Sequence, residues 1–189
     1  MYQAADKANV SEKPWVLDPV GAGATSYRNS ALTTLLDYKP TVIRGNASEI
    51  MALAKVNTSI TKGVDSTAQS NEAYEAAKFL NQQYGSIVCI SGETDIIIDS
   101  KSSIFIENGH PLMTKVTGLG CSATAVIGAF IAIIRDKMEA VAAATALFSL
   151  SGQLAATKSD GPGSLQMNLL DTLHNISEDS FHQYVKISL

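Results

Sequence analysis

Short apolar runs alternate with amphipathic stretches over the first half of the chain. The runs at Trp15–Leu17, Thr41–Ile43 and Ser86–Ile90 are bounded by turn-forming residues and have the length and β-branched character of buried strands. Segments with helical spacing lie before and between them, at Ala4–Val10, Asn29–Leu36 and Asn71–Gln83. Strands that alternate with helices are typical of βαβ crossovers, so this half predicts a parallel sheet.

The pattern changes after the third run. SGETD, at Ser91–Asp95, turns the chain directly into IIIDS, and SSIFIEN gives a further short strand, which favours an antiparallel edge. From Gly118 the spacing is helical almost to Thr157, and the charged Arg135–Lys137 divides it into two buried Ala-rich helices. GPGS then precedes a final helical segment. We therefore expect one α/β domain over residues 1–189, with a mostly parallel sheet flanked by helices.

Composition narrows the function classes. With 46% hydrophobic and 17% charged residues, the 189-residue chain fits a soluble globular protein. A net charge of -4 argues against a general nucleic-acid binder but leaves room for a local anion site. The uncharged run Cys121–Ile134 is shorter than the roughly 18 apolar residues of a membrane span. Two cysteines form no disulfide framework, and no secretory signal is visible, so we expect a cytoplasmic protein without membrane partners.

Polar or glycine-rich residues follow each of the three predicted parallel strands. They read Asp18-Pro19-Val20-Gly21, Arg44-Gly45-Asn46 and Ser91-Gly92-Glu93. Ligands of open α/β sheets bind beyond the carboxyl ends of the strands, so a ligand site is expected there.

Two of these stretches have competing interpretations. DPVGAGAT, from Asp18, lacks the spacing of a dinucleotide or Walker A loop, and taken alone it is better explained as a plain strand-to-helix turn than as a ligand-binding loop. In RGNASE, Arg44 can bind a phosphate, and Glu49 can bind magnesium directly or through water. Alternatively, Asn46 or Ser48 caps a helix, Glu49 complements the helix dipole, and Arg44 pairs with a surface acid.

The Gly118-Leu119-Gly120-Cys121 turn runs straight into the long helical segment. Its glycines allow close backbone approach, and the helix N-terminus favours anions and the thiolate form of Cys121. A small buried residue at the start of a core helix is the other interpretation of Cys121. Cys89 lies within an apolar strand and is expected in the core. His110, His174 and His182 lack metal-ligand spacing and are expected to be surface or capping residues.

Five blocks, taken in order, resemble the hydroxyethylthiazole kinase family, the thiamine-salvage members of the ribokinase-like superfamily. They are WVLDPVGAGAT, TVIRGNASEI, SGETD, KVTGLGCSATAVIGAF and GPGS. The resemblance implies a ribokinase-like fold and phosphorylation of the hydroxyl of 5-(2-hydroxyethyl)-4-methylthiazole by ATP with Mg²⁺. Most kinases of that superfamily have an aspartate where this chain has Cys121, so the thiol favours the thiazole kinases over hydroxymethylpyrimidine or sugar kinases.

The resemblance also implies a role for each matching residue. Arg44 and Ser91 would contact ATP, whereas Glu49 and Asp18 would organise Mg²⁺, partly through water. Gly118 would approach the substrate, and Gly118, Leu119, Gly120 and Cys121 would form an anion hole for the moving phosphoryl group. Cys121 would be the catalytic residue, either as the base that removes the hydroxyl proton or as a group that orients the hydroxyl.

One departure from the family pattern concerns the N-terminus. Family members begin with a βαβ region before the DPVGAG strand, and it completes the sheet and supplies thiazole-binding residues in a homotrimer with sites between subunits. Here Trp15–Leu17 follows only one weak helix. We therefore expect the N-terminal strands to be missing, the phosphate side to be present and the thiazole side to be incomplete. The alternative function is a catalytically weak form that binds nucleotide or partner subunits.

Overall fold

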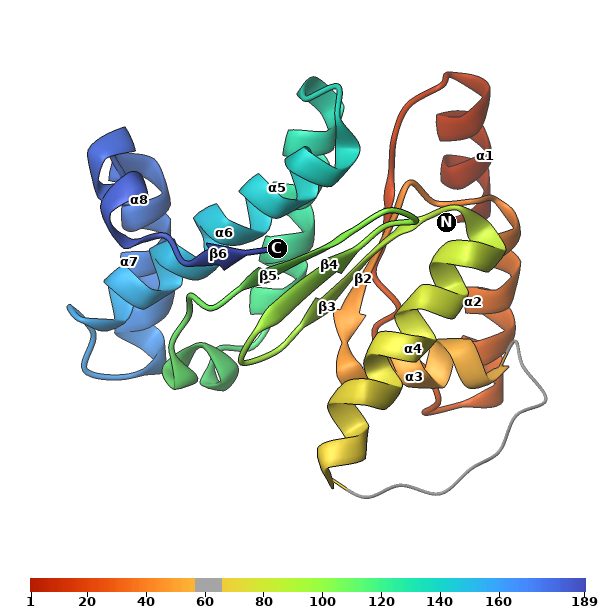
Figure 1. The fold of residues 1–189 in the computed structure, drawn as a ribbon, viewed down its shortest axis with the longest axis horizontal. Coiled ribbons are helices and arrows are strands. Elements are labelled where there is room, and N and C mark those ends of the chain that lie inside the picture. Colours follow the sequence, from red (N-terminus) through yellow and green to blue (C-terminus); the bar gives the residue numbers. More distant parts are fainter. Residues whose placement is uncertain (57–65) are drawn as a thin grey trace. The chain divides into compact units, whose positions relative to one another are not determined.

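The computed structural model describes residues 1–56 and 66–189, and the chain divides into two compact units. The first unit comprises Met1–Gly92 and Ile96–Ser103, and the second comprises Glu93–Asp95 and Ile104–Leu189. Figure 1 shows strands and helices in both, coloured along the sequence. The division falls near the SGETD turn, where the sequence pattern changes from parallel to antiparallel.

The first unit contains the predicted parallel strands. β1 (Val16–Leu17) pairs in parallel with β2 (Val42–Asn46), which pairs in parallel with β3 (Ile87–Ser91). β4 (Asp95–Ile98) then runs antiparallel to β3, with Cys89 opposite Ile97. The parallel strands and the antiparallel neighbour are as the sequence predicts.

One strand boundary in the prediction was wrong. The apolar run ends at Ile43, but β2 continues through Arg44 and Gly45 to Asn46. The reason is pairing, because backbone partners on β3 extend the ladder as far as Asn46 opposite Ser91. Arg44 and Asn46 are therefore strand residues rather than loop residues.

Four helices belong to the first unit: α1 (Tyr2–Val10), α2 (Ser26–Asp37), α3 (Ala47–Val56) and α4 (Ser66–Tyr84). α2 begins three residues before the predicted Asn29, because the Thr25 hydroxyl accepts a hydrogen bond from the Arg28 backbone N–H and caps the helix. In Figure 1, α3 and α4 lie side by side. Their apolar faces and the strands form one core, which includes Leu36, Ile43, Ile50, Leu53, Leu80, Val88 and Ile98.

The second unit is mainly helical. It contains most of β5 (Ser103–Ile106), the 3₁₀ helix η1 (Pro111–Lys115), α5 (Leu119–Ile133), α6 (Lys137–Ala156), α7 (Pro162–Asn175), α8 (Glu178–Tyr184) and β6 (Ile187–Ser188). The predicted division of the long helical segment is confirmed, since Asp136 caps α6 through the Glu139 N–H. A single final helix was predicted, whereas the structure has α7 and α8, because Ser177 caps a separate helix.

Two buried contacts tie the second unit together. The Ser149 hydroxyl donates to the Asp95 carboxylate at 2.6 Å, and both residues are buried. The Asn108 side chain donates to the Gln153 side chain and to the Tyr184 carbonyl, each at 3.0 Å. Because buried polar groups need partners, these bonds hold Asp95 against α6 and hold the segment after β5 against α6 and the C-terminal segment. In the part of the chain that is described, no helix is long and apolar enough to cross a membrane.

Candidate functional site

The strand register brings the polar strand ends of the first unit to one edge. Leu17 pairs with Ile43 and Asn46 pairs with Ser91, so Asp18 directly after β1, Arg44 near the end of β2 and Ser91 at the end of β3 all lie towards the same edge. This edge lies at the carboxyl ends of the strands, where the sequence predicts a ligand site.

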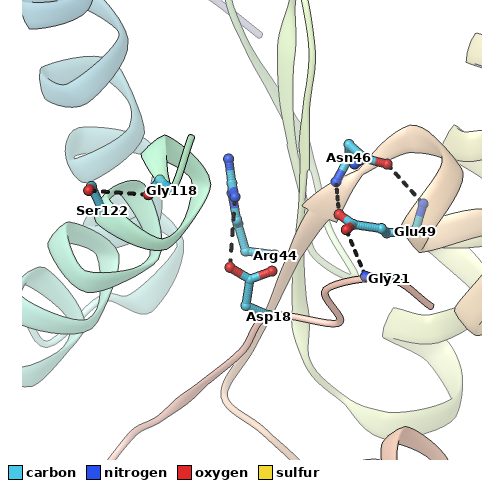
Figure 2. Close-up of polar contacts among 7 residues, drawn as sticks. All are labelled: Asp18, Gly21, Arg44, Asn46, Glu49, Gly118 and Ser122. Carbon is cyan, nitrogen blue, oxygen red and sulfur yellow. Dashed lines mark hydrogen bonds and ion pairs between the residues drawn. The ribbon is translucent and has the colours of Figure 1, made fainter. Parts of the chain in front are cut away.

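Asp18 and Arg44 form an ion pair at this edge. The Arg44 Nη1 atom lies 3.9 Å from the Asp18 Oδ2 atom, and each side chain is 14% exposed. Figure 2 shows the Asp18 carboxylate directed towards Arg44 and marks the ion pair with a dashed line. A separation of 3.9 Å is too long for a hydrogen bond, so the guanidinium keeps its donors for another group. A planar, forked cation of this kind suits a phosphate.

Glu49 is attached to the loop after β1 and to the end of β2 through contacts with two backbone amides. Its Oε1 atom accepts the Gly21 N–H at 3.1 Å, and its Oε2 atom accepts the Asn46 N–H at 3.0 Å (Figure 2). The Asn46 side chain accepts the Glu49 N–H at 3.0 Å in return. This reciprocal pair is a capping box at the start of α3, and it decides in favour of Asn46 over Ser48 as the cap.

Loss of the Asn46 cap is expected to destabilise the protein modestly. We expect Asn46→Ala to lower the free energy of unfolding by about 1 kcal/mol, because one N–H at the start of α3 loses its acceptor. Urea denaturation followed by circular dichroism measures this change. Ser48→Ala is the matched control, since the Ser48 hydroxyl only donates to the Asn46 oxygen. An equal loss in both variants would contradict the capping role.

Gly45 allows the close approach on which this arrangement depends. A Cβ atom at position 45 would lie 3.3 Å from the Glu49 Cβ and Oε2 atoms and 3.3 Å from the Pro19 Cγ atom. Contacts this short force a neighbour to move, so any side chain at position 45 would displace Glu49 or the loop after β1.

The start of α5 in the second unit has the features that the sequence indicates. Gly118 precedes the helix with a φ of 84°, a left-handed conformation that favours glycine, and no side chain caps this end. The Gly118 carbonyl accepts the Ser122 N–H at 3.1 Å and its hydroxyl at 3.4 Å (Figure 2). The preceding N–H groups, those of Leu119, Gly120 and Cys121, belong to the first turn and have no intrahelical acceptor.

Cys121 is exposed, which rules out a small buried residue as its explanation. Cys89 is 1% exposed and lies in the core, as expected. His110 caps η1 through its Nδ1 atom, and His174 and His182 are exposed, in agreement with surface and capping roles. Among the described residues, no group of three or more His, Cys, Asp or Glu residues can hold a metal ion.

A separate pocket of about 370 Å³ lies between α6, α7 and α8 in the second unit. None of the predicted site residues lines it. Two of its polar side chains are engaged internally, since Asn168 donates to the Lys158 carbonyl and Asn175 donates to the Asp171 carbonyl. In the first unit the strand ends, and in the second unit the start of α5, are therefore the stronger candidates for functional residues.

Comparison with known proteins gives relatives of one family. The Hydroxyethylthiazole kinase family profile matches residues 1–179. The chain is 50% identical to a hydroxyethylthiazole kinase of Syntrophus aciditrophicus, over 99% of this chain and 70% of that protein. It is 47% identical to one of Leptospira borgpetersenii, over 94% of this chain and 67% of the relative.

The solved structures that resemble this chain include one of the same kind of kinase as the sequence relatives. A hydroxyethylthiazole kinase protein from Pyrococcus horikoshii matches with a TM-score of 0.88 and 31% identity, over 98% of this chain and 69% of that one. A Staphylococcus aureus pyridoxal kinase, in complex with AMP-PCP and pyridoxal, matches with a TM-score of 0.61 and 21% identity, over 81% of this chain and 56% of that one. The second likeness concerns the fold alone, and together with a ribokinase-like superfamily structure from Enterococcus faecalis it confirms the ribokinase-like α/β fold.

Proposed function

Because the chain belongs to the Hydroxyethylthiazole kinase family, we propose that it transfers the γ-phosphoryl group of ATP to the hydroxyl of 5-(2-hydroxyethyl)-4-methylthiazole. This reaction salvages the thiazole half of thiamine. The observation that carries the site assignment is the exposed Cys121 thiol in the first turn of α5, behind a left-handed Gly118 and an uncapped helix start. The family favours this function over a catalytically weak binding form and over a hydroxymethylpyrimidine kinase.

Arg44 and Ser91 are proposed to contact ATP. Within the described residues, the Arg44 guanidinium makes the ion pair with Asp18 and no side-chain hydrogen bond, so its donors remain for phosphate oxygens. Ser91 ends β3 level with Asn46, which places it at the same carboxyl edge. The two residues thus offer a charged and a neutral donor on adjacent strands.

Asp18 and Glu49 are proposed to hold Mg²⁺, partly through water. Each Glu49 oxygen accepts one backbone N–H and retains a lone pair for a cation or its bound water. Magnesium commonly uses one or two carboxylates together with waters and substrate phosphates, so this pair of carboxylates fits it. When bound, magnesium would neutralise charge on the transferring phosphates.

The start of α5 is proposed as the anion hole. The first-turn N–H groups of Leu119, Gly120 and Cys121 carry the partial positive charge of the helix N-terminus, which stabilises charge on a transferring phosphoryl group. A Cβ atom added at Gly118 would have no neighbouring atom within 4 Å beyond the adjoining backbone, so the substrate can approach Gly118 closely. Preorganised donors of this kind supply much of the acceleration in phosphoryl transfer.

Cys121 is proposed as the base. In the balanced reaction, the substrate oxygen forms a bond to the γ-phosphorus and the bond from that phosphorus to the ADP oxygen breaks. The hydroxyl proton passes to the Cys121 sulfur, which accepts it as a thiolate and becomes a thiol, and ADP leaves with the electron pair of the broken bond. A base that removes this proton contributes about 10²- to 10⁴-fold to the rate.

Assembly and location follow the family resemblance. We propose that both units act as one kinase domain, since the family profile runs through both from residue 1 to residue 179. We further propose a cytoplasmic homotrimer with sites between subunits. Large apolar side chains on the surface of the second unit, Ile133 at 82% and Leu170 at 64% exposure, are available for subunit contacts.

A coupled assay of ADP release tests the proposed reaction. With Mg²⁺ and ATP, ADP release is expected to depend on 5-(2-hydroxyethyl)-4-methylthiazole and to be absent with 5-ethyl-4-methylthiazole, which lacks the hydroxyl. Hydroxymethylpyrimidine serves as the competing substrate. Release driven by the pyrimidine but not by the thiazole alcohol would overturn the proposed substrate. A thermal shift with ATP but no release with either alcohol would support the catalytically weak form instead.

A further inference from the structure

The peptide group between Val20 and Gly21 is held from both sides. On one side, the Arg28 Nη1 atom donates to the Val20 carbonyl at 2.8 Å. On the other, the Gly21 N–H donates to the Glu49 Oε1 atom at 3.1 Å. The carbonyl and the N–H belong to the same planar peptide unit, so neither can rotate without moving the other.

Gly21 is the residue that makes this arrangement possible. Its φ of 69° is left-handed, and a Cβ atom there would lie only 2.9 Å from the Arg28 Nη1 atom. The Arg28 side chain therefore lies directly over the backbone of Gly21. A larger residue at this position would meet both backbone strain and the guanidinium.

Arg28 reaches this loop from the first turn of α2. The N-terminus of that helix is fixed by the Thr25 hydroxyl, which accepts the Arg28 N–H at 3.2 Å. A second contact from the same helix holds the other end of the loop, because the Asn29 Oδ1 atom accepts the Gly23 N–H at 2.8 Å. The loop after Asp18 thus has two separate attachments to α2, and only the one from Arg28 connects through a shared peptide to Glu49.

We propose that Arg28 is a positioning residue that sets the orientation of the Glu49 carboxylate through the Val20–Gly21 peptide. The inference rests on the proposed role of Glu49 in organising Mg²⁺. When Arg28 holds the Val20 carbonyl, the Gly21 N–H faces Oε1 and the carboxylate is fixed at both oxygens, by Gly21 and by Asn46. Without that hold, the peptide rotates and Oε1 loses its donor, so the carboxylate must be ordered when the cation binds.

Binding of Mg²⁺ and ADP gives the most direct test, because it needs no turnover. In isothermal titration calorimetry at graded Mg²⁺ concentrations, Arg28→Ala is expected to raise the Mg²⁺ requirement for ADP binding about three- to tenfold, the size of one ordinary hydrogen bond. Arg28→Lys keeps a donor and a charge, so it should recover part of that loss. Asn29→Ala is the matched control, since it releases Gly23 from the same loop and leaves the Val20–Gly21 peptide held.

The amide exchange rate of Gly21, measured by nuclear magnetic resonance in the absence of Mg²⁺, gives a second readout. Exchange at Gly21 should quicken in Arg28→Ala and in Glu49→Gln but not in Asn29→Ala. Equal effects of Arg28→Ala and Asn29→Ala on the Mg²⁺ requirement would overturn the inference, because they would indicate general stiffening of the loop. An unchanged requirement in Arg28→Ala, with a raised one in Glu49→Gln, would overturn it while preserving the proposed metal role. An unchanged requirement in Glu49→Gln would instead contradict the proposed metal role itself.

Discussion

Replacing Cys121 by alanine is expected to lower kcat about 10²- to 10⁴-fold, the usual contribution of a general base. The Kd for ATP should stay near that of the unchanged protein, because the proposed ATP contacts lie on β2 and β3 rather than at the thiol. The side chain is exposed, so its removal leaves no cavity and the fold should be retained. Steady-state kinetics with the thiazole alcohol and calorimetry with ATP measure the two quantities.

Ser122→Ala is the matched control for this variant. Ser122 is the next residue in the same helical turn and is also exposed, but its hydroxyl makes only a long contact, at 3.4 Å, with the Gly118 carbonyl. We expect its kcat to change little. If kcat were the same in Cys121→Ala and in Ser122→Ala, this would show that the thiol takes no part in the chemical step.

Replacing Arg44 by alanine is expected to raise the KM for ATP about tenfold to 100-fold, the size of one or two hydrogen bonds to a charged group. The kcat should fall less than in Cys121→Ala, because ATP still binds through other groups once its concentration is raised. Initial rates over a range of ATP concentrations separate the two parameters.

Arg44→Lys tests whether Arg44 binds phosphate or only stabilises the fold. Lysine keeps the positive charge beside Asp18 but loses the planar fork of donors, so we expect a KM between those of the unchanged protein and Arg44→Ala. A KM unaffected in both variants, with a lowered free energy of unfolding, would show that Arg44 only pairs with Asp18.

The pattern of apolar residues predicts the strands and helices of the first unit because these elements bury apolar side chains in one shared core. Each parallel strand has a short apolar run, and α2, α3 and α4 each bury Leu, Ile or Ala side chains in the same core. The end of β2 could not be predicted in this way, because Arg44 and Asn46 are polar yet remain in the strand through pairing with β3. Pairing with a neighbour is a tertiary effect that a local pattern does not contain.

One part of the candidate site could be predicted from the spacing of two residues along the chain. Asn46 and Glu49 stand three residues apart at a helix start, which is the spacing of a capping box. The exposure of Cys121 was not predictable, because α5 carries no charged residue and its sequence does not mark which side faces solvent. The same limit applies to Arg28, whose contact with the Val20 carbonyl depends on the left-handed turn at Gly21.

The contact between Asp95 and Ser149 illustrates another limit. The two residues are 54 positions apart, one at the start of β4 and the other in the apolar helix α6, so no local signal connects them. Their hydrogen bond at 2.6 Å satisfies a carboxylate that is 6% exposed. Partners of buried polar groups are chosen by the fold as a whole, and the sequence shows only that such a partner must exist.

The central claim is phosphoryl transfer from ATP to the hydroxyl of the thiazole, and transfer of a labelled γ-phosphate tests it most directly. The protein is incubated with Mg²⁺, γ-labelled ATP and 5-(2-hydroxyethyl)-4-methylthiazole, and the products are separated by chromatography. Label is expected in the thiazole phosphate, in equal amount to the ADP formed, and it should be strongly reduced in Cys121→Ala. Label found only in inorganic phosphate, or no consumption of ATP despite its binding, would contradict the claim.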